Sequence, residues 1–263
     1  MSQENQKNLL ESLELNKKIK RRNFISFSTF LLVGGAGLFS LKKLFEAPIE
    51  AEGGITSGTR IPLRKTLNNN ESFFRKFFSH EHLVKTYPKS MAAKNVRVNS
   101  DIGIEDKDYP VQKWKLQIHK SNQEVLELSM DQIKSLPKTE IIFDFKCVEG
   151  WDQIQHWGGV KFIDLIDHLG LKELLKHDYV GMETPNQEYY VGLDMESATH
   201  PQTILAYEMN GLPITMAHGA PLRLIVPVKY GIKNIKRIGS ISFSNQRPKD
   251  YWAEQGYDYY SGL

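Results

Sequence analysis

The stretch Phe145–Phe162, FKCVEGWDQIQHWGGVKF, contains Cys147, the only cysteine among 263 residues. The residues before it, Glu140–Phe145 (EIIFDF), predict a strand that runs directly into the cysteine. After it, Val160–Leu169 has apolar residues at helical spacing and is closed by Gly170, which predicts a helix. A lone cysteine forms no internal disulfide, and its commonest role is that of a small buried hydrophobic residue. Only the sequence around Cys147 can therefore indicate whether this cysteine is structural or functional.

Outward from this stretch, the sequence predicts short strands with few helices. Lys113–His119 and Glu124–Leu128 alternate apolar and polar residues, as half-buried strands do. Ser129 is placed to cap a short helix that Pro137 ends, and Asn210-Gly211 predicts a turn between two strands. Further strands are expected at 179–182, 188–193, 203–209, 222–228 and 235–243. This arrangement is typical of an α+β domain.

The N-terminal part of the chain has a different composition. Residues 1–23 are basic and include Lys20-Arg21-Arg22, which resembles a twin-arginine export signal. Residues 24–41 (FISFSTFLLVGGAGLFSL) carry no charge, and as a helix they would extend for about 27 Å, enough to cross a membrane. No small-residue cleavage site follows, so we expect a retained N-terminal anchor rather than a cleaved signal. Residues 42–72 are expected to be a linker, and 73–263 the folded domain, beginning with a short amphipathic helix.

Charge argues against nucleic acid as a partner. The whole chain has a net charge of +3, but residues 1–45 alone carry eight Lys or Arg and three Glu. The basic excess therefore belongs to the N-terminal tail, and the remaining residues are slightly acidic. A basic groove for phosphate backbones is not expected on the folded part.

The residues around Cys147 resemble the molybdenum-cofactor domain of the sulfite oxidase family, in particular its bacterial, exported branch, which includes methionine sulfoxide reductases. The resemblance covers roughly residues 73–263 and implies a mixed-sheet molybdopterin-binding domain. In this family the cysteine of C-x-E-x-W is the protein ligand of molybdenum, which assigns that role to Cys147. A soft thiolate suits such a metal centre and has to be deprotonated to bind it.

A second block, Leu205–Phe243, resembles the family segment that holds the pterin and its phosphate. By that resemblance, the cofactor contacts fall on His218, Arg223 and the tripeptide Asn234-Ile235-Lys236. Arginine and lysine side chains are suited to phosphate oxygens, and Gly219 would allow a close approach of the backbone.

The resemblance assigns three further site residues. Thr184 and Asn99 match positions that contact the cofactor, and Tyr257 matches a tyrosine that lines the substrate pocket. In sulfite oxidases an arginine directly precedes that asparagine and helps to bind the anionic substrate. Here Val98 stands in that place and the arginine is Arg97. In a strand, a shift of one residue would point its side chain to the opposite face, which argues against sulfite as the substrate.

The implied enzyme is a molybdenum–molybdopterin (Mo-MPT) oxidoreductase that transfers an oxygen atom to or from a small substrate. Reduction of an S-oxide or N-oxide fits the exported branch better than sulfite oxidation. The sequence shows no haem domain and no additional sandwich domain for dimerisation. We therefore expect a monomer on the periplasmic side of the bacterial inner membrane that exchanges electrons with a membrane haem protein or a soluble cytochrome.

Two other functions stay open at this stage. Cys147 could be the nucleophile of a hydrolase, with His156, His200 or His218 as the base. Alternatively, the chain could be a membrane-anchored binding module that kept the fold and lost the chemistry.

Overall fold

The computed structural model describes residues 34–49, 60–120 and 124–263. The chain divides into two units, and the boundary in the sequence lies between Pro48 and Ile49. In the first unit, residues 34–46 are helical. Among the described residues no helix is both long and apolar enough to cross a membrane. Residues 24–33 of the expected anchor lie outside the described part, so the anchor stays a prediction.

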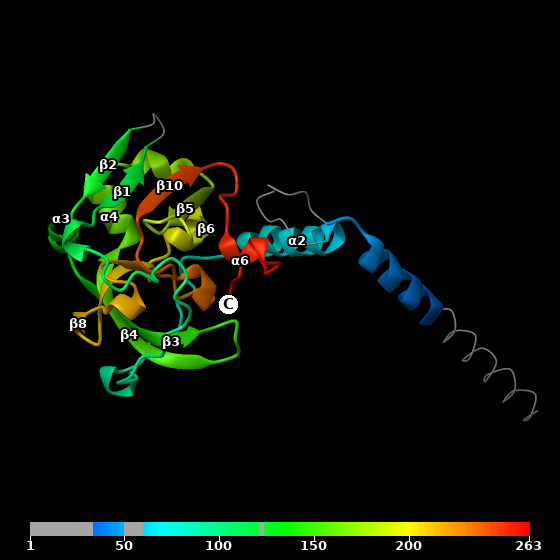
Figure 1. Ribbon diagram of the computed structural model, residues 1–263, viewed down its shortest axis with the longest axis horizontal. Coiled ribbons are helices and arrows are strands. Elements are labelled where there is room, and N and C mark those ends of the chain that lie inside the picture. Colours follow the sequence, from blue (N-terminus) through cyan, green and yellow to red (C-terminus); the bar gives the residue numbers. More distant parts are fainter. Residues whose placement is uncertain (1–33, 50–59, 121–123) are drawn as a thin grey trace, which may run out of the picture. The chain divides into compact units, whose positions relative to one another are not determined.

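The second unit contains two five-stranded sheets, which confirm the expected mixed-sheet α+β fold (Figure 1). The first sheet has the order β2-β1-β10-β5-β6. Its β1–β10 pair is parallel, and its other pairs are antiparallel. The strands are β1 (Leu116–His119), β2 (Val125–Leu128), β5 (Tyr179–Glu183), β6 (Tyr190–Asp194) and β10 (Ser240–Ser244). The strand expected at 235–243 is therefore limited to its C-terminal part.

The second sheet is built on a long hairpin of two antiparallel strands, β3 and β4 (Figure 1). Cys147 follows directly after the first of them. The order of the sheet is β3-β4-β7-β8, with β9 paired to β7. The strands are β3 (Thr139–Lys146), β4 (Asp152–Lys161), β7 (Ile204–Met209), β8 (Leu212–Pro213) and β9 (Arg223–Ile225). The expected turn is confirmed, because Asn210 and Gly211 have φ values of 53° and 78° between β7 and β8.

Strand β4 was not predicted from the sequence. Residues 155–160 are all buried, so both faces of the strand are covered and no polar alternation marks it. The Gly158-Gly159 pair also suggests a break. In the structure, Gly159 allows β7 to approach, because a Cβ there would lie 2.1 Å from the carbonyl oxygen of Leu205. The ladder is irregular at that point.

Within the second unit the helices are short apart from α2. The α-helices are α2 (Ile61–Phe77), α3 (Met130–Lys134), α4 (Phe162–His168), α5 (Met195–Ala198) and α6 (Tyr251–Glu254). The 3₁₀ helices are η1 (Lys89–Met91), η2 (Val111–Lys113), η3 (Lys172–Lys176), η4 (Met216–His218) and η5 (Gly231–Lys233). Ser129 caps α3 in a complete capping box with Gln132, as its position suggested.

Helix α2 differs from the expectation of a linker up to residue 72 and a helix from Phe73. The structure has one continuous helix that begins at Ile61 and ends at Phe77. Its buried residues are Arg64 and Glu71, so the face towards the domain is polar. An apolar periodicity, which is the usual sequence signal of a surface helix, is therefore absent from its first half.

Candidate active site

Cys147 lies in the tight turn that connects β3 and β4. Its backbone N–H donates to the carbonyl of Trp151 (2.9 Å), and its carbonyl accepts from the N–H of Gly150 (3.1 Å). Gly150 has a φ of 84°, which favours glycine. The cysteine is buried, but it lines an open hollow of about 400 Å³ together with Trp151 and Tyr230. Burial raises the pKa of the Cys147 thiol, and backbone N–H groups of the turn act in the opposite direction.

Arg97 contacts Trp151, which lines this hollow. Its guanidinium is 4.7 Å from the ring of Trp151, and its charge acts to lower the pKa of Cys147. The expectation that Arg97 faces away from the site was therefore wrong. It assumed a strand at this point, whereas residues 95–100 have no regular secondary structure, and the rule of alternating faces does not apply.

A second, smaller hollow brings together three of the expected cofactor residues, Asn99, Asn234 and Lys236. Gly231 also lines this hollow and fixes the position of the loop that carries two of them. A Cβ at Gly231 would lie 2.8 Å from the ring of Phe145, so only glycine lets η5 pack this closely on the end of β3. The loop is thereby held next to the turn of Cys147.

The ammonium group of Lys236 is surrounded by carbonyl oxygens. It donates to the carbonyls of Asn99 (2.5 Å), Ser100 (2.6 Å) and Ala217 (2.9 Å). Burial lowers the pKa of Lys236 to about 7, and the charge of Arg223 contributes to the decrease. The charge of Asp101 acts against this decrease.

Arg223 is fully buried and is also held by carbonyl oxygens. Its two terminal nitrogens donate to the carbonyls of His218 (3.1 Å) and Asn234 (3.3 Å), and the guanidinium lies 4.5 Å from the ring centre of Trp157. Its Nε has no hydrogen-bond partner. Burial lowers the pKa of Arg223 to about 9.

His218 is buried in the same region. Its Nδ1 is 2.9 Å from the hydroxyl of Thr215, and its Nε2 is 3.2 Å from the carbonyl oxygen of Val96. Burial and the nearby positive charges lower the pKa of His218, which keeps the ring neutral at pH 7. Gly219 has a φ of 96°, and a Cβ there would lie 2.6 Å from the Cβ of Lys236. The chain therefore needs glycine at this position to bring the two segments together.

The other predicted residues do not present their side chains to either hollow. Ile235 packs into the main hydrophobic core, which leaves only its backbone for a ligand. The Thr184 hydroxyl contacts the side chain of Asn186 (2.7 Å) and accepts from the N–H of Tyr189 (3.1 Å). Tyr257 is 41% exposed and packs edge-on against Trp252 at 5.2 Å. The assigned role of Tyr257 stays a prediction.

The sequence did not single out Tyr189, which lines the smaller hollow. Its hydroxyl donates to the carbonyl of Ile232 (2.6 Å), and burial together with the charge of Asp250 raises its pKa. A sequence signal existed, because Tyr189 lies five residues after Thr184 within the same matching block. Tyr230, in the wall beside Cys147, was likewise not singled out, although it lies within the matching block Leu205–Phe243.

The two buried cations Arg223 and Lys236 suit an anionic ligand. Neither Arg223 nor Lys236 forms an ion pair with a carboxylate within the described ranges, and both are desolvated. Two buried cations that have only carbonyl partners are costly unless an anion joins them. The pterin phosphate is such an anion, and Cys147 offers the thiolate that molybdenum requires. These residues therefore fit a molybdopterin cofactor: Cys147 would bind the metal, and Arg223 and Lys236 would bind the phosphate.

Comparison with known proteins agrees with this fit. Residues 102–252 match the family described as oxidoreductase molybdopterin binding domain. A protein of Azospira oryzae, YedZ1, provisionally named as a protein-methionine-sulfoxide reductase subunit, is 30% identical over 186 residues, which are 70% of each chain. The protein-methionine-sulfoxide reductase catalytic subunit MsrP of Campylobacter jejuni is 33% identical over 59% of this chain. The match covers 58% of that protein, less than two thirds of its length.

Among solved structures, the sulfane dehydrogenase SoxCD of Paracoccus pantotrophus aligns with 75% of this chain and 56% of its own, with 16% identity and a TM-score of 0.48. The family match itself extends over more than half of the 263 residues and includes the turn of Cys147 and the loop of Lys236. The chain therefore belongs to the molybdopterin-dependent oxidoreductases of the sulfite oxidase family, and it is an enzyme that binds a molybdopterin cofactor.

Proposed function

We propose that the enzyme reduces sulfoxides, with methionine sulfoxide as the preferred class of substrate. The observation that carries the proposal is the charge around the mouth of the hollow over Cys147. Lys146 and Asp152 line this hollow, Arg97 and Glu149 contact Trp151 in its wall, and Asp144 is paired with Lys146, which makes three acidic and two basic side chains. A mouth with more negative than positive charge disfavours an anion such as sulfite and accepts a neutral S-oxide. The names of the two relatives support the same substrate class.

The reaction consumes two protons and two electrons: R₂S=O becomes R₂S, and the oxygen leaves as water. The bound cofactor supplies the two-electron chemistry, and the protein binds and orients the substrate. Arg97 is placed to donate a hydrogen bond to the sulfoxide oxygen. Trp151 supports it, because its indole N–H is fixed by the carboxylate of Glu149 at 2.8 Å and its ring lies under the guanidinium. The electrons come from a separate carrier, either a membrane haem protein or a soluble cytochrome.

The direct test is an activity profile of the loaded enzyme. Methionine sulfoxide and an N-oxide are offered with a reduced viologen dye as electron donor, and sulfite is offered with ferricyanide as acceptor. We expect kcat/KM for methionine sulfoxide to exceed that for the N-oxide by about tenfold or more, with negligible oxidation of sulfite. Efficient sulfite oxidation without sulfoxide reduction would replace this proposal with a sulfite dehydrogenase. Bound cofactor with no turnover of any substrate would indicate the binding module.

We further propose that the enzyme acts on the periplasmic side of the inner membrane as a monomer, after export through residues 20–26 and anchoring by residues 24–41. A buried organic cofactor has to be inserted before export, and the twin-arginine route carries folded proteins. Changing Arg21 and Arg22 together to lysine tests the route. Loaded enzyme should then accumulate in the cytoplasm, whereas unchanged export of the variant would refute the signal.

A further inference from the structure

Helix α2 packs on the domain with its polar face, whereas an ordinary surface helix packs with its apolar face. The residues it directs at the domain are polar: Arg64, Asn68, Glu71 and Arg75, which follow one stripe of the helix. Arg64 donates to the carbonyl of Ala253 (2.7 Å), and Glu71 accepts from the hydroxyl of Tyr179 (2.7 Å). Arg247 also contacts both Asn68 and Glu71. The helix is therefore held on the domain by charge and hydrogen bonds.

Its large apolar side chains are exposed instead. Leu63 is 45% exposed, Phe73 57%, Phe74 51% and Phe77 66%. Phe73 packs against Phe74 and Phe77, with ring centres 5.4 and 5.0 Å apart. Amphipathic helices normally bury this kind of side chain. The three phenylalanines form one contiguous apolar cluster, which marks an interaction site more often than scattered residues do, and Leu63 lies ten residues before Phe73 on the same helix. We call these four residues the α2 apolar face.

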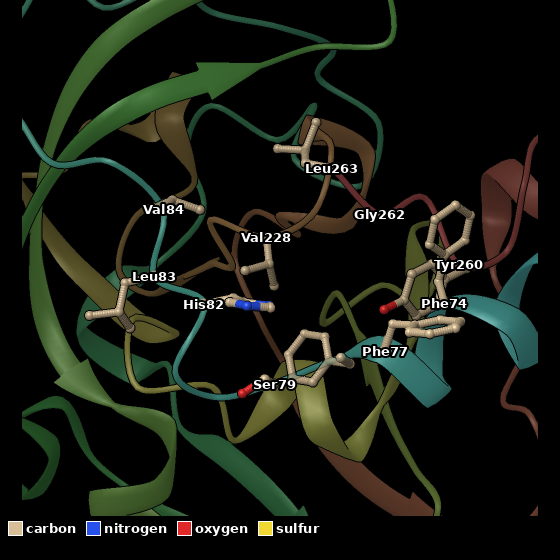
Figure 2. A pocket seen from close by; sticks show the side chains of 11 residues that line it. Phe74, Phe77, Ser79, His82, Leu83, Val84, Val228, Tyr260, Gly262 and Leu263 are labelled. Carbon is tan, nitrogen blue, oxygen red and sulfur yellow. The ribbon is translucent and has the colours of Figure 1, made fainter.

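A groove extends this face onto the domain. Figure 2 shows Phe74 and Phe77 on one side of the groove and Leu83, Val84 and Val228 on the other, with Tyr260 and Leu263 beside them. The groove has a volume of about 290 Å³, and its polar lining includes Ser79 and His82. Leu83 and Leu263 are more than half exposed, so the apolar surface continues across the groove.

The charges on the helix indicate what kind of surface it meets. Within α2 the exposed charged side chains are Lys65 and Lys76, and the single acidic residue, Glu71, is buried in its ion pairs. Phenylalanine beside exposed lysine is the composition of helices that lie in the interface of an anionic bilayer. In the sequence, Ile61 follows the uncharged run 24–41 by only 20 residues. A membrane that holds the run would therefore present its surface to α2 at high effective concentration.

We propose that the α2 apolar face and its groove dock on an anionic lipid bilayer, with α2 in the headgroup region. The proposal rests on the anchoring suggested above and adds a second membrane contact from the folded domain. This contact would hold the domain in one orientation on the membrane, where the anchor alone would let it rotate.

A label at the face tests the proposal in the full-length, cofactor-loaded enzyme. Phe77→Cys is labelled with an environment-sensitive dye, since the only native cysteine, Cys147, is buried and is the expected metal ligand. Leu212→Cys is the matched control, because Leu212 is 68% exposed on β8. Vesicles of phosphatidylglycerol should shift the emission at position 77 to shorter wavelength, and vesicles of phosphatidylcholine should do so less. The label at position 212 should not respond.

A second variant separates the face from the anchor. Phe73→Ser in the Phe77→Cys protein should remove most of the shift while the protein still co-sediments with vesicles through its N-terminal run. Co-sedimentation without any change in emission wavelength at position 77 would overturn the docking proposal. The α2 apolar face would then be expected to bind a protein. Failure to co-sediment would overturn docking and anchoring together. Sulfoxide reduction with the dye assay needs no membrane, so its outcome is independent of both.

Discussion

Four buried cations lie within the short segment from Arg223 to Lys236, and they fall into two kinds. Lys229 and Lys233 each face a buried carboxylate, Asp194 at 2.8 Å and Asp250 at 2.5 Å. Among the residues that the structure describes, Arg223 and Lys236 donate hydrogen bonds to carbonyl oxygens and meet no carboxylate. All four are at most 7% exposed, so burial does not distinguish them. We expect a buried cation with a carboxylate partner to belong to the fold, and one without such a partner to be available to a ligand.

The energetic consequence differs between the two pairs. A buried cation with its carboxylate is balanced within the protein, and removing either partner leaves an uncompensated charge. A buried cation with only carbonyl partners already carries that penalty, which an incoming anion would relieve. The first pair should therefore matter for stability, and the second for the cofactor.

Cys147→Ser should have the largest effect on activity. It sets the reference for a residue that serves the cofactor and not the fold. Without the thiolate, the metal loses the ligand that the family assigns to the protein, and we expect activity to fall by about 100-fold or more. The unfolding temperature of the cofactor-free protein should hardly change, because serine has almost the same size. Elemental analysis for molybdenum and a thermal melt measure the two effects. Full molybdenum content and turnover in the variant would refute the assignment of Cys147.

Lys233→Met tests the first kind. The substitution leaves the carboxylate of Asp250 buried beside the ring of Tyr259 without its cation. Breaking a buried ion pair in this way costs about 3–5 kcal/mol, and urea unfolding of the cofactor-free protein measures it. Stability equal to that of the wild type would contradict the claim that this pair is part of the fold.

Lys236→Met is the matched variant three residues further along. Here no carboxylate is left without a partner, so the free energy of unfolding of the cofactor-free protein should stay the same or increase. Cofactor retention should fall about 10- to 100-fold, the value of one charge-assisted hydrogen bond of about 1.5–3 kcal/mol. Pterin fluorescence after dialysis measures retention. A variant that is destabilised but keeps its pterin would place Lys236 with the structural cations and undo the comparison.

The two kinds of cation also show what the sequence could predict. The resemblance assigned Arg223, Asn234 and Lys236 to the cofactor. In the structure Asn234 and Lys236 line the smaller hollow, and Arg223 is buried behind it with a hydrogen bond to the carbonyl of Asn234. The resemblance said nothing of Lys229 and Lys233, whose partners Asp194 and Asp250 are distant in sequence. Only the folded chain shows which lysine meets an acid.

The same dependence on contacts between distant residues explains the errors in the secondary structure predicted from the sequence. Alternating polarity located the half-buried strands β1 and β2 within a few residues. It missed β4, which is buried on both faces, and it missed the start of α2, whose polar face points inward. Arg97 was assigned to the wrong side because a strand was assumed where the chain is irregular. In each case tertiary contacts override the local pattern.

The smallest expected effect is a dependence of stability on pH that Lys236 alone confers. Its pKa is about 7 in the cofactor-free folded state and about 10.4 in the unfolded chain. Between these values the unfolded state binds more protons, so the free energy of unfolding should rise with pH, by about 1 kcal/mol between pH 7 and pH 8. Urea unfolding at the two pH values measures this increase for the wild type and for Lys236→Met, which lacks the titrating group. The difference between the two proteins isolates Lys236 from the other titrating groups. If the increase is the same in both proteins, Lys236 does not titrate in this range, and its ammonium group is stabilised within the fold like those of the paired lysines.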